Sequence, residues 1–141
     1  MKIAIATVAF VTALLPATNA LAEQWSCSFP NQRLDAWIRG QIMVSTDGTE
    51  ATVFDSLINE AHAGPIGARV TANNDKRLTA KWTLKRIELR HGFAPRIDYT
   101  LTYLKDTGRA NITATAPLLE DYNNADRAGG NFVASGSCKP R

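Results

Sequence analysis

The sequence predicts an all-β fold, a small up-and-down antiparallel β-barrel of about six to eight strands with one short helix. Three observations lead to this prediction. Apolar and polar residues alternate through the second half, turn signals separate the alternating segments, and one cysteine lies near each end of the mature chain. A β-sandwich is the alternative, because it also buries one face of a sheet made of sequential hairpins.

Alternation is clearest in residues 77–85, 96–103 and 109–116. The apolar side of these segments consists of Leu78, Ala80, Trp82, Leu84, Ile97, Tyr99, Leu101, Tyr103, Ala110, Ile112, Ala114 and Ala116. The opposite side is mostly Thr, Lys and Arg, as expected of strands with one buried face. The loop Asp106-Thr107-Gly108 places glycine where a hairpin needs a left-handed conformation. The three segments are therefore expected to form a meander.

The first half shows the same kind of pattern with weaker alternation. A strand over residues 37–45 meets the hairpin signal Asp47-Gly48, and a second strand returns over residues 50–55. Ser56 is expected to cap a helix over residues 57–63, which Gly64 and Pro65 would end. A short strand over residues 69–71 follows, and residues 131–138 are expected to form the last strand.

Residues 1–22 are expected to be a cleavable export signal, which leaves residues 23–141 as a single β domain. Lys2, an apolar run over residues 3–15 and a small-residue tail ending at Ala22 are the three parts of a secretory signal. The apolar run is shorter than the roughly 20 residues that a helix needs to cross a bilayer. We therefore expect a secreted or periplasmic protein, cleaved near Ala22, with no stable membrane anchor.

The two cysteines are expected to form one disulfide, Cys27 to Cys138, because an exported chain meets an oxidising compartment. Metal binding by two thiols is the alternative, but the spacing of known cysteine metal sites is missing. If the first and last strands are neighbours, as in a closed barrel, the bridge would join them. The disulfide therefore favours the barrel over the sandwich.

A local excess of positive charge is the first candidate for function, although the net charge of the chain is only +3. The predicted outward side of the three segments carries Arg77, Lys81, Lys85, Arg96 and Arg109 against Asp98 alone. Such a face could contact an anionic component of the cell envelope or an acidic protein, or it could be an ordinary solvated sheet surface. Nucleic acid is not expected, because the aromatic residues of these strands point inward.

The predicted interior is the second candidate, since it combines the large side chains Trp82, Tyr99 and Tyr103 with several alanines. Large and small side chains can interdigitate into a packed core. If they do not, the barrel would hold a cavity for a small amphipathic ligand.

The long polar stretch over residues 117–130 is a third candidate, as a loop that contacts a partner through Tyr122, Asn123 and Asn124. Its oxygen-bearing residues do not have the spacing of a calcium-binding loop. His62 and His91 stand in no catalytic motif, so no catalytic residue, metal or cofactor is expected. The leading hypothesis is a non-enzymatic binding module, followed by a ligand carrier and then by an enzyme of unknown reaction.

Residues 74–82, 96–99 and 101–105, together with Gly136-Ser137-Cys138, resemble a group of small exported bacterial proteins without an assigned activity. The resemblance covers most of the mature chain and implies a small β domain, but no mechanism. Size, export and a disulfide-linked β architecture are also similar to periplasmic lysozyme-inhibitor barrels. No inhibitory motif is matched, so that similarity implies no residue role.

Overall fold

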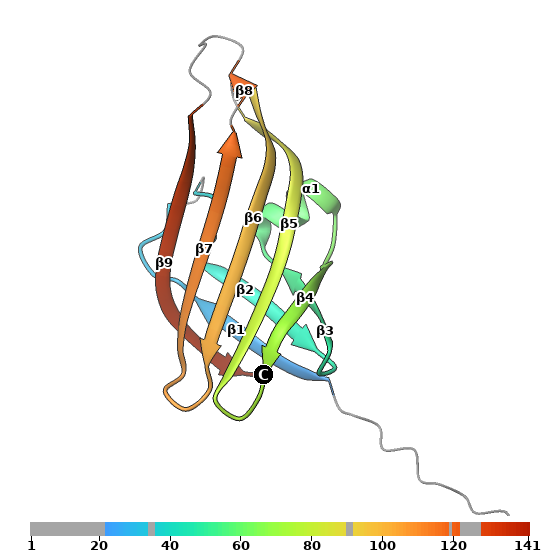
Figure 1. The fold of residues 1–141 in the computed structure, drawn as a ribbon, viewed down its shortest axis with the longest axis vertical. Coiled ribbons are helices and arrows are strands. Elements are labelled where there is room, and N and C mark those ends of the chain that lie inside the picture. Colours follow the sequence, from blue (N-terminus) through green and yellow to red (C-terminus); the bar gives the residue numbers. More distant parts are fainter. Residues whose placement is uncertain (1–21, 34–35, 90–91, 119, 122–127) are drawn as a thin grey trace, which may run out of the picture.

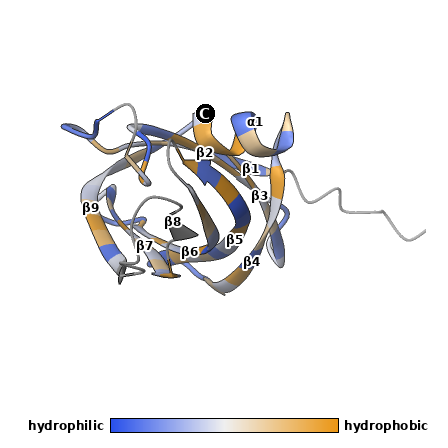
Figure 2. Ribbon diagram, turned by 90° about the horizontal axis from the view of Figure 1, so that it is seen from above, coloured by the Kyte–Doolittle hydropathy of each residue, from blue (hydrophilic) through white to orange (hydrophobic). Residues whose placement is uncertain are grey.

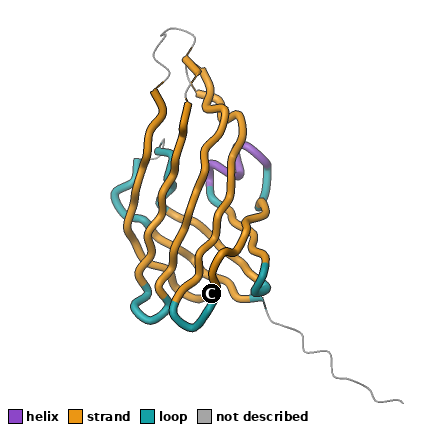
Figure 3. The backbone as a smooth tube through the Cα atoms, viewed as in Figure 1, coloured by secondary structure: helices purple, strands orange, loops and turns teal. Residues whose placement is uncertain are grey.

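The computed structural model describes residues 22–33, 36–89, 92–118, 120–121 and 128–141. Its strands are β1 (Glu23–Ser28), β2 (Gln41–Thr46), β3 (Glu50–Phe54), β4 (Ile66–Asn73), β5 (Arg77–Leu89), β6 (Gly92–Leu104), β7 (Arg109–Leu118), β8 (Glu120–Asp121) and β9 (Ala128–Pro140). One short helix, α1 (Ser56–His62), lies between β3 and β4 (Figures 1 and 3). All but the last residue of the expected export signal lies outside the described residues.

Eight of these strands close an antiparallel barrel. Strands β1 to β7 follow one another around the ring, and β9 lies between β7 and β1. The pairing of β5 with β6 closes the sheet, so that the strands form a ring when seen from above (Figure 2). The two-residue β8 pairs only with the beginning of β6 and takes no place in the ring. The predicted up-and-down barrel is confirmed, and the sandwich alternative is wrong.

The barrel interior is the hydrophobic core. Every residue that the alternation predicts to face inward is buried. Large and small side chains meet across neighbouring strands, since Tyr99 is opposite Ala114 and Tyr103 is opposite Ala110. An eight-stranded barrel is narrow enough for such side chains to fill its interior.

The hairpin turns form where glycine and short polar side chains predict them. Gly48 and Gly108 have φ angles of 111° and 73°, the left-handed region that favours glycine. The Asp47 carboxylate accepts a hydrogen bond of 3.1 Å from the Glu50 amide, which closes the turn between β2 and β3. The Asn74 side chain likewise accepts from the Arg77 amide in the turn between β4 and β5.

The disulfide joins neighbouring strands at the barrel closure. Cys27 of β1 is directly opposite Cys138 of β9, and their Cα atoms are 4.0 Å apart. Gly136 lies two residues before Cys138 in β9, where a Cβ atom would collide with the carbonyl group of Ser28 and lie 2.9 Å from the Phe29 ring. The chain therefore passes close to itself at this point, and only glycine fits without a shift of the backbone.

The predicted strand over residues 37–45 is wrong at its beginning, because β2 starts only at Gln41. The consecutive residues Ile38 and Arg39 are both buried, which the alternating faces of a strand do not allow. Strand β1 was not predicted, although Trp25, Cys27 and Phe29 are buried in alternation and carry the signal for it.

The predicted helix is confirmed, but both of its ends differ. Asp55, and not Ser56, is the N-cap, because its side chain accepts a hydrogen bond of 2.8 Å from the Ile58 amide. At the other end Ala63, and not Gly64, adopts the left-handed conformation. Its amide donates to the Asn59 carbonyl and so satisfies the end of the helix.

The predicted loop over residues 117–130 is shorter than expected. Strand β7 continues to Leu118, β8 occupies Glu120–Asp121, and β9 begins at Ala128 instead of residue 131. The strand expected over residues 69–71 is also longer than predicted, because it is part of β4, which spans Ile66–Asn73. The missed strand ends carry few of the β-branched and alternating residues on which sequence prediction relies.

Candidate binding surface

The predicted cations lie together on the outside of the barrel. Arg77, Lys81 and Lys85 of β5, Arg96 of β6 and Arg109 of β7 are all exposed. The pairing of β4 with β5 adds Arg69, whose strand position is opposite Lys81. We call these six residues the cationic face. Sequence reasoning missed Arg69, although the turn signal at residues 73–75 could have paired the two strands.

Most cations of this face are not in an ion pair with a described residue, although Glu50 of β3 is directly opposite Arg69. Arg96 is the exception, because its Nε atom lies 2.9 Å from Oδ2 of Asp98. The other oxygen of Asp98 accepts a hydrogen bond of 2.7 Å from the Thr83 hydroxyl. The remaining five cations form no ion pair with any described residue. The predicted excess of positive charge therefore comes mainly from the five cations other than Arg96.

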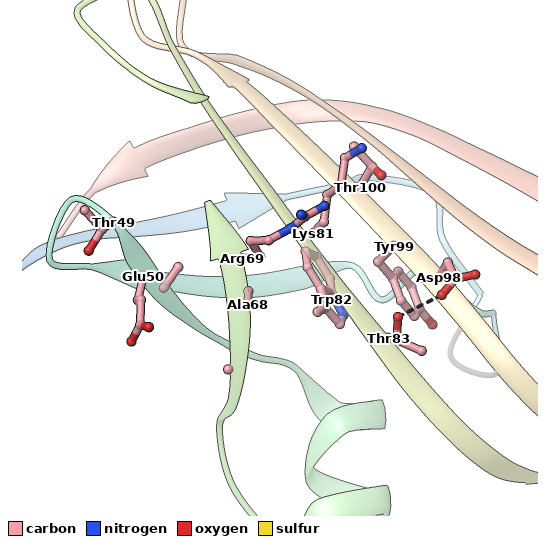
Figure 4. A pocket seen from close by; sticks show the side chains of 12 residues that line it. Thr49, Glu50, Ala68, Arg69, Lys81, Trp82, Thr83, Asp98, Tyr99 and Thr100 are labelled. Carbon is pink, nitrogen blue, oxygen red and sulfur yellow. Dashed lines mark hydrogen bonds between the residues drawn. The ribbon is translucent and has the colours of Figure 1, made fainter. Parts of the chain in front are cut away.

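A surface hollow of about 810 Å³ lies beside this face, where β4 and β5 part (Figure 4). Arg69 and Lys81 line it together with Glu50, Thr83 and Asp98. Across from β5 the hollow is bounded by Gly67 and Ala68, and a Cβ atom added to Gly67 would meet nothing within 4 Å. The hollow is therefore open beside Gly67.

The aromatic residues predicted for the interior pack against one another. The rings of Trp82 and Tyr99 stack with their centroids 5.1 Å apart and their planes 3° apart. Tyr103 packs against Trp25 at 5.9 Å. The Tyr99 hydroxyl donates a 2.8 Å hydrogen bond to the carbonyl of Trp37, whereas the buried indole N–H of Trp82 has no acceptor among the described residues.

Two buried polar side chains lie beside α1, and no sequence pattern predicts them. Arg39 and Asp55 are only 9% and 4% exposed, and Arg39 Nη2 lies 3.5 Å from Oε2 of Glu60. Burial raises the pKa of Asp55, against the opposing effects of the Ile58 amide and the Arg39 charge. Burial also raises the pKa of Tyr99, with a further contribution from the Asp55 charge. Tyr99 therefore remains a hydrogen-bond donor at physiological pH.

The remaining candidates can be placed only in part. His62 is exposed at the end of α1, while His91 and the loop residues Tyr122, Asn123 and Asn124 lie outside the described residues. No group of His, Cys, Asp and Glu in the described parts of the chain could hold a metal ion. None of the helical residues described forms a segment long and apolar enough to cross a membrane.

Comparison with protein-family models, curated proteins and solved structures finds no match to this chain.

Proposed function

We propose that the protein is a non-enzymatic binding module whose cationic face contacts an anionic partner, either a component of the cell envelope or an acidic protein. The unpaired cations of this face carry the proposal, because Asp98 is already held by Arg96 and Thr83. Exposed cations without opposite charges nearby attract anionic surfaces and raise the rate of encounter with them. Such binding would weaken as the salt concentration rises.

We place this activity outside the cytoplasm, in the periplasm or beyond the cell, after cleavage near Ala22. The disulfide between Cys27 and Cys138 supports this location, because such bonds persist in oxidising compartments. The basic, apolar and small-residue pattern at the beginning of the chain also supports it.

Charge reversal tests the proposal. Lys81→Glu with Lys85→Glu should strongly reduce retention of the protein on envelope material, while the thermal midpoint stays close to that of the wild type. Lys139→Glu with Arg141→Glu is the matched control, because it changes the net charge equally at exposed residues outside the cationic face. Equal retention of the wild type and the Lys81/Lys85 variant would refute the proposal.

A second candidate function is carriage of a small amphipathic ligand inside the barrel. The buried N–H of Trp82 favours it, because a buried donor without an acceptor is costly and a ligand could supply that acceptor. Against it stands the pairing of large with small inward side chains, Tyr99 with Ala114 and Tyr103 with Ala110, which favours a packed interior in a barrel of eight strands.

Native mass spectrometry of the protein purified from its own host distinguishes the two candidates. A carrier would show a reproducible additional mass that is lost on unfolding. A uniformly bare protein would count against carriage and would leave the proposed binding module unaffected.

A further inference from the structure

Strand β5 is paired on one side only over much of its length. Its pairing with β4 ends where Lys81 meets Arg69, but its pairing with β6 continues as far as Leu89. Figure 1 shows β4 turning away from β5 toward α1 above this point. Residues 82–89 of β5 therefore have a free strand edge on the side away from β6, which we call the β5 edge.

The hydrogen bonds at the turn show which main-chain groups face this edge. The Lys76 carbonyl accepts from Lys105, next to β6, whereas the Arg77 carbonyl accepts from Asn74, next to β4. Successive residues of a strand direct their N–H and C=O groups to opposite sides. The odd-numbered residues Thr83 and Lys85 therefore direct theirs to the β5 edge. Neither main chain has a hydrogen-bond partner there among the described residues.

Two hollows follow this edge. The hollow of about 810 Å³ adjoins residues 81–83, with Gly67 and Ala68 on its far side. A second hollow of about 290 Å³ adjoins residues 85–88, with Leu57, Glu60 and Ala61 of α1 on its far side. Residues 81–83 and 85–88 of β5 therefore border open space, and an added strand would lie between β5 on one side and β4 and α1 on the other.

The charges along the edge favour an acidic occupant. Lys81 and Lys85 are exposed and make no ion pair with a described residue. The acidic side chains nearby are mostly paired already, as Glu60 is with Arg39 at 3.5 Å and Glu88 with Arg86 at 3.4 Å. Glu50 is the exception, and it lies opposite Arg69. Alternate side chains of an added strand would lie beside Lys81 and Lys85, where opposite charges stabilise the pairing.

We propose that the β5 edge binds an extended acidic segment of a partner protein by strand addition. Main-chain hydrogen bonds to Thr83 and Lys85 would supply affinity, and acidic side chains at alternate positions would pair with Lys81 and Lys85. This inference depends on the proposed function and specifies the partner of the cationic face as a polypeptide. Lipid head groups and polysaccharides offer the same charge but cannot extend the sheet.

The test uses a synthetic capped peptide of about eight residues, long enough to span the edge, with glutamate alternating with valine or threonine. Its binding to the whole protein is followed by NMR and amide hydrogen exchange. The expected result is slower exchange at the amides of Thr83 and Lys85. N-methylation of alternate peptide residues should weaken binding by about tenfold or more, because it removes the donors of the ladder while keeping the charge.

A substitution in the protein also tests whether main-chain hydrogen bonds at the β5 edge contribute to peptide binding. Thr83→Pro removes an N–H that faces the β5 edge and leaves the hydrogen bonds to β6 intact, so it should weaken peptide binding. Thr83→Val is its matched control, because it removes the hydroxyl bonded to Asp98 but keeps the N–H. If Thr83→Pro does not fold, the N-methylated peptide alone decides the question.

Each outcome separates this inference from the proposed function. Equal binding of the plain and N-methylated peptides would overturn strand addition and leave a charge-based cationic face. Retention on anionic vesicles or polysaccharide without any peptide binding would likewise overturn strand addition and leave a charge-based cationic face. Failure of the wild type to bind the peptide, the vesicles and envelope material would overturn both.

Discussion

The hydroxyl of Tyr99 donates a 2.8 Å hydrogen bond to the carbonyl oxygen of Trp37 and so links the middle of β6 to the irregular segment that precedes β2. This segment cannot form strand, because Ile38 and Arg39 are buried in succession. It lies against the barrel with the Trp37 ring packed 6.1 Å from that of Phe132. The hydrogen bond therefore joins the interior of the barrel to a segment that is also held by the ion pair of Arg39 with Glu60.

Tyr99→Phe should lower the free energy of unfolding by about 1–2 kcal/mol, because it leaves the Trp37 carbonyl without its partner. Tyr103→Phe is the matched control, since the Tyr103 hydroxyl makes no hydrogen bond with a described residue, and it should cost less. Urea unfolding of the three proteins measures the difference. Equal losses in the two variants would show that the hydrogen bond contributes nothing measurable.

Gly136→Ala should be strongly destabilising, by about 2 kcal/mol or more, because overpacking forces a shift of the backbone. The new methyl group would collide with the Ser28 carbonyl and the Phe29 ring. Gly67→Ala is the control, because nothing lies within 4 Å of a Cβ at that position. Thermal unfolding should show a large decrease in the midpoint for the first variant and little change for the second.

The disulfide should stabilise the barrel closure more than the central hairpins. Cys27 and Cys138 are separated by 111 residues, and closing so long a loop contributes up to about 5 kcal/mol in the chain-entropy model. Replacing both cysteines by alanine should reduce the free energy of unfolding by a large part of that amount, as measured in urea.

The variant that lacks both cysteines should also lose hydrogen-exchange protection in particular strands. Amide hydrogen exchange should increase first in β1 and β9, which the disulfide joins, before it increases in β5 and β6. Earlier opening of the Trp82 and Tyr99 positions would contradict the role of the bridge as a link between the first and last strands.

Much of the barrel can be predicted from the sequence because its second half obeys the simplest rule of strand formation. Segments such as that around Trp82 alternate strictly and end at turn residues, so both the strands and their inward faces are predicted correctly. The missed features have two causes. The burial of Arg39 beside Glu60 joins residues that are far apart in the chain and arises only when it has folded. The Asp55 cap is a contact with Ile58, three residues away, but Asp and Ser are equally good N-cap residues, so the sequence does not choose between neighbours.

In the candidate site, too, some features follow from local alternation and others depend on strand pairing. The exposed positions of Lys81 and Lys85 follow from alternation alone, whereas the position of Arg69 opposite Lys81 depends on a strand pairing. The free β5 edge could not be predicted at all. It arises because residues 66–68 of β4, which precede Arg69, do not pair with β5, and this is a property of the barrel as a whole.

Asp55 makes stability depend on pH in a direction that can be measured. Burial raises its folded-state pKa above the ordinary value of 3.8, so the folded state holds this proton more tightly than the unfolded state. In the range between 3.8 and the raised pKa the folded protein binds more protons than the unfolded chain. The free energy of unfolding contributed by this group must therefore fall as the pH rises through that range.

Asp55→Asn isolates this contribution, because asparagine can still cap α1 but does not titrate. The wild type minus Asp55→Asn difference in the free energy of unfolding should decrease as the pH rises above 3.8 and then become constant. Urea unfolding of both proteins over a pH series measures this difference. A difference that instead increases with pH would show that the Arg39 charge and the Ile58 amide outweigh the cost of burying the carboxylate.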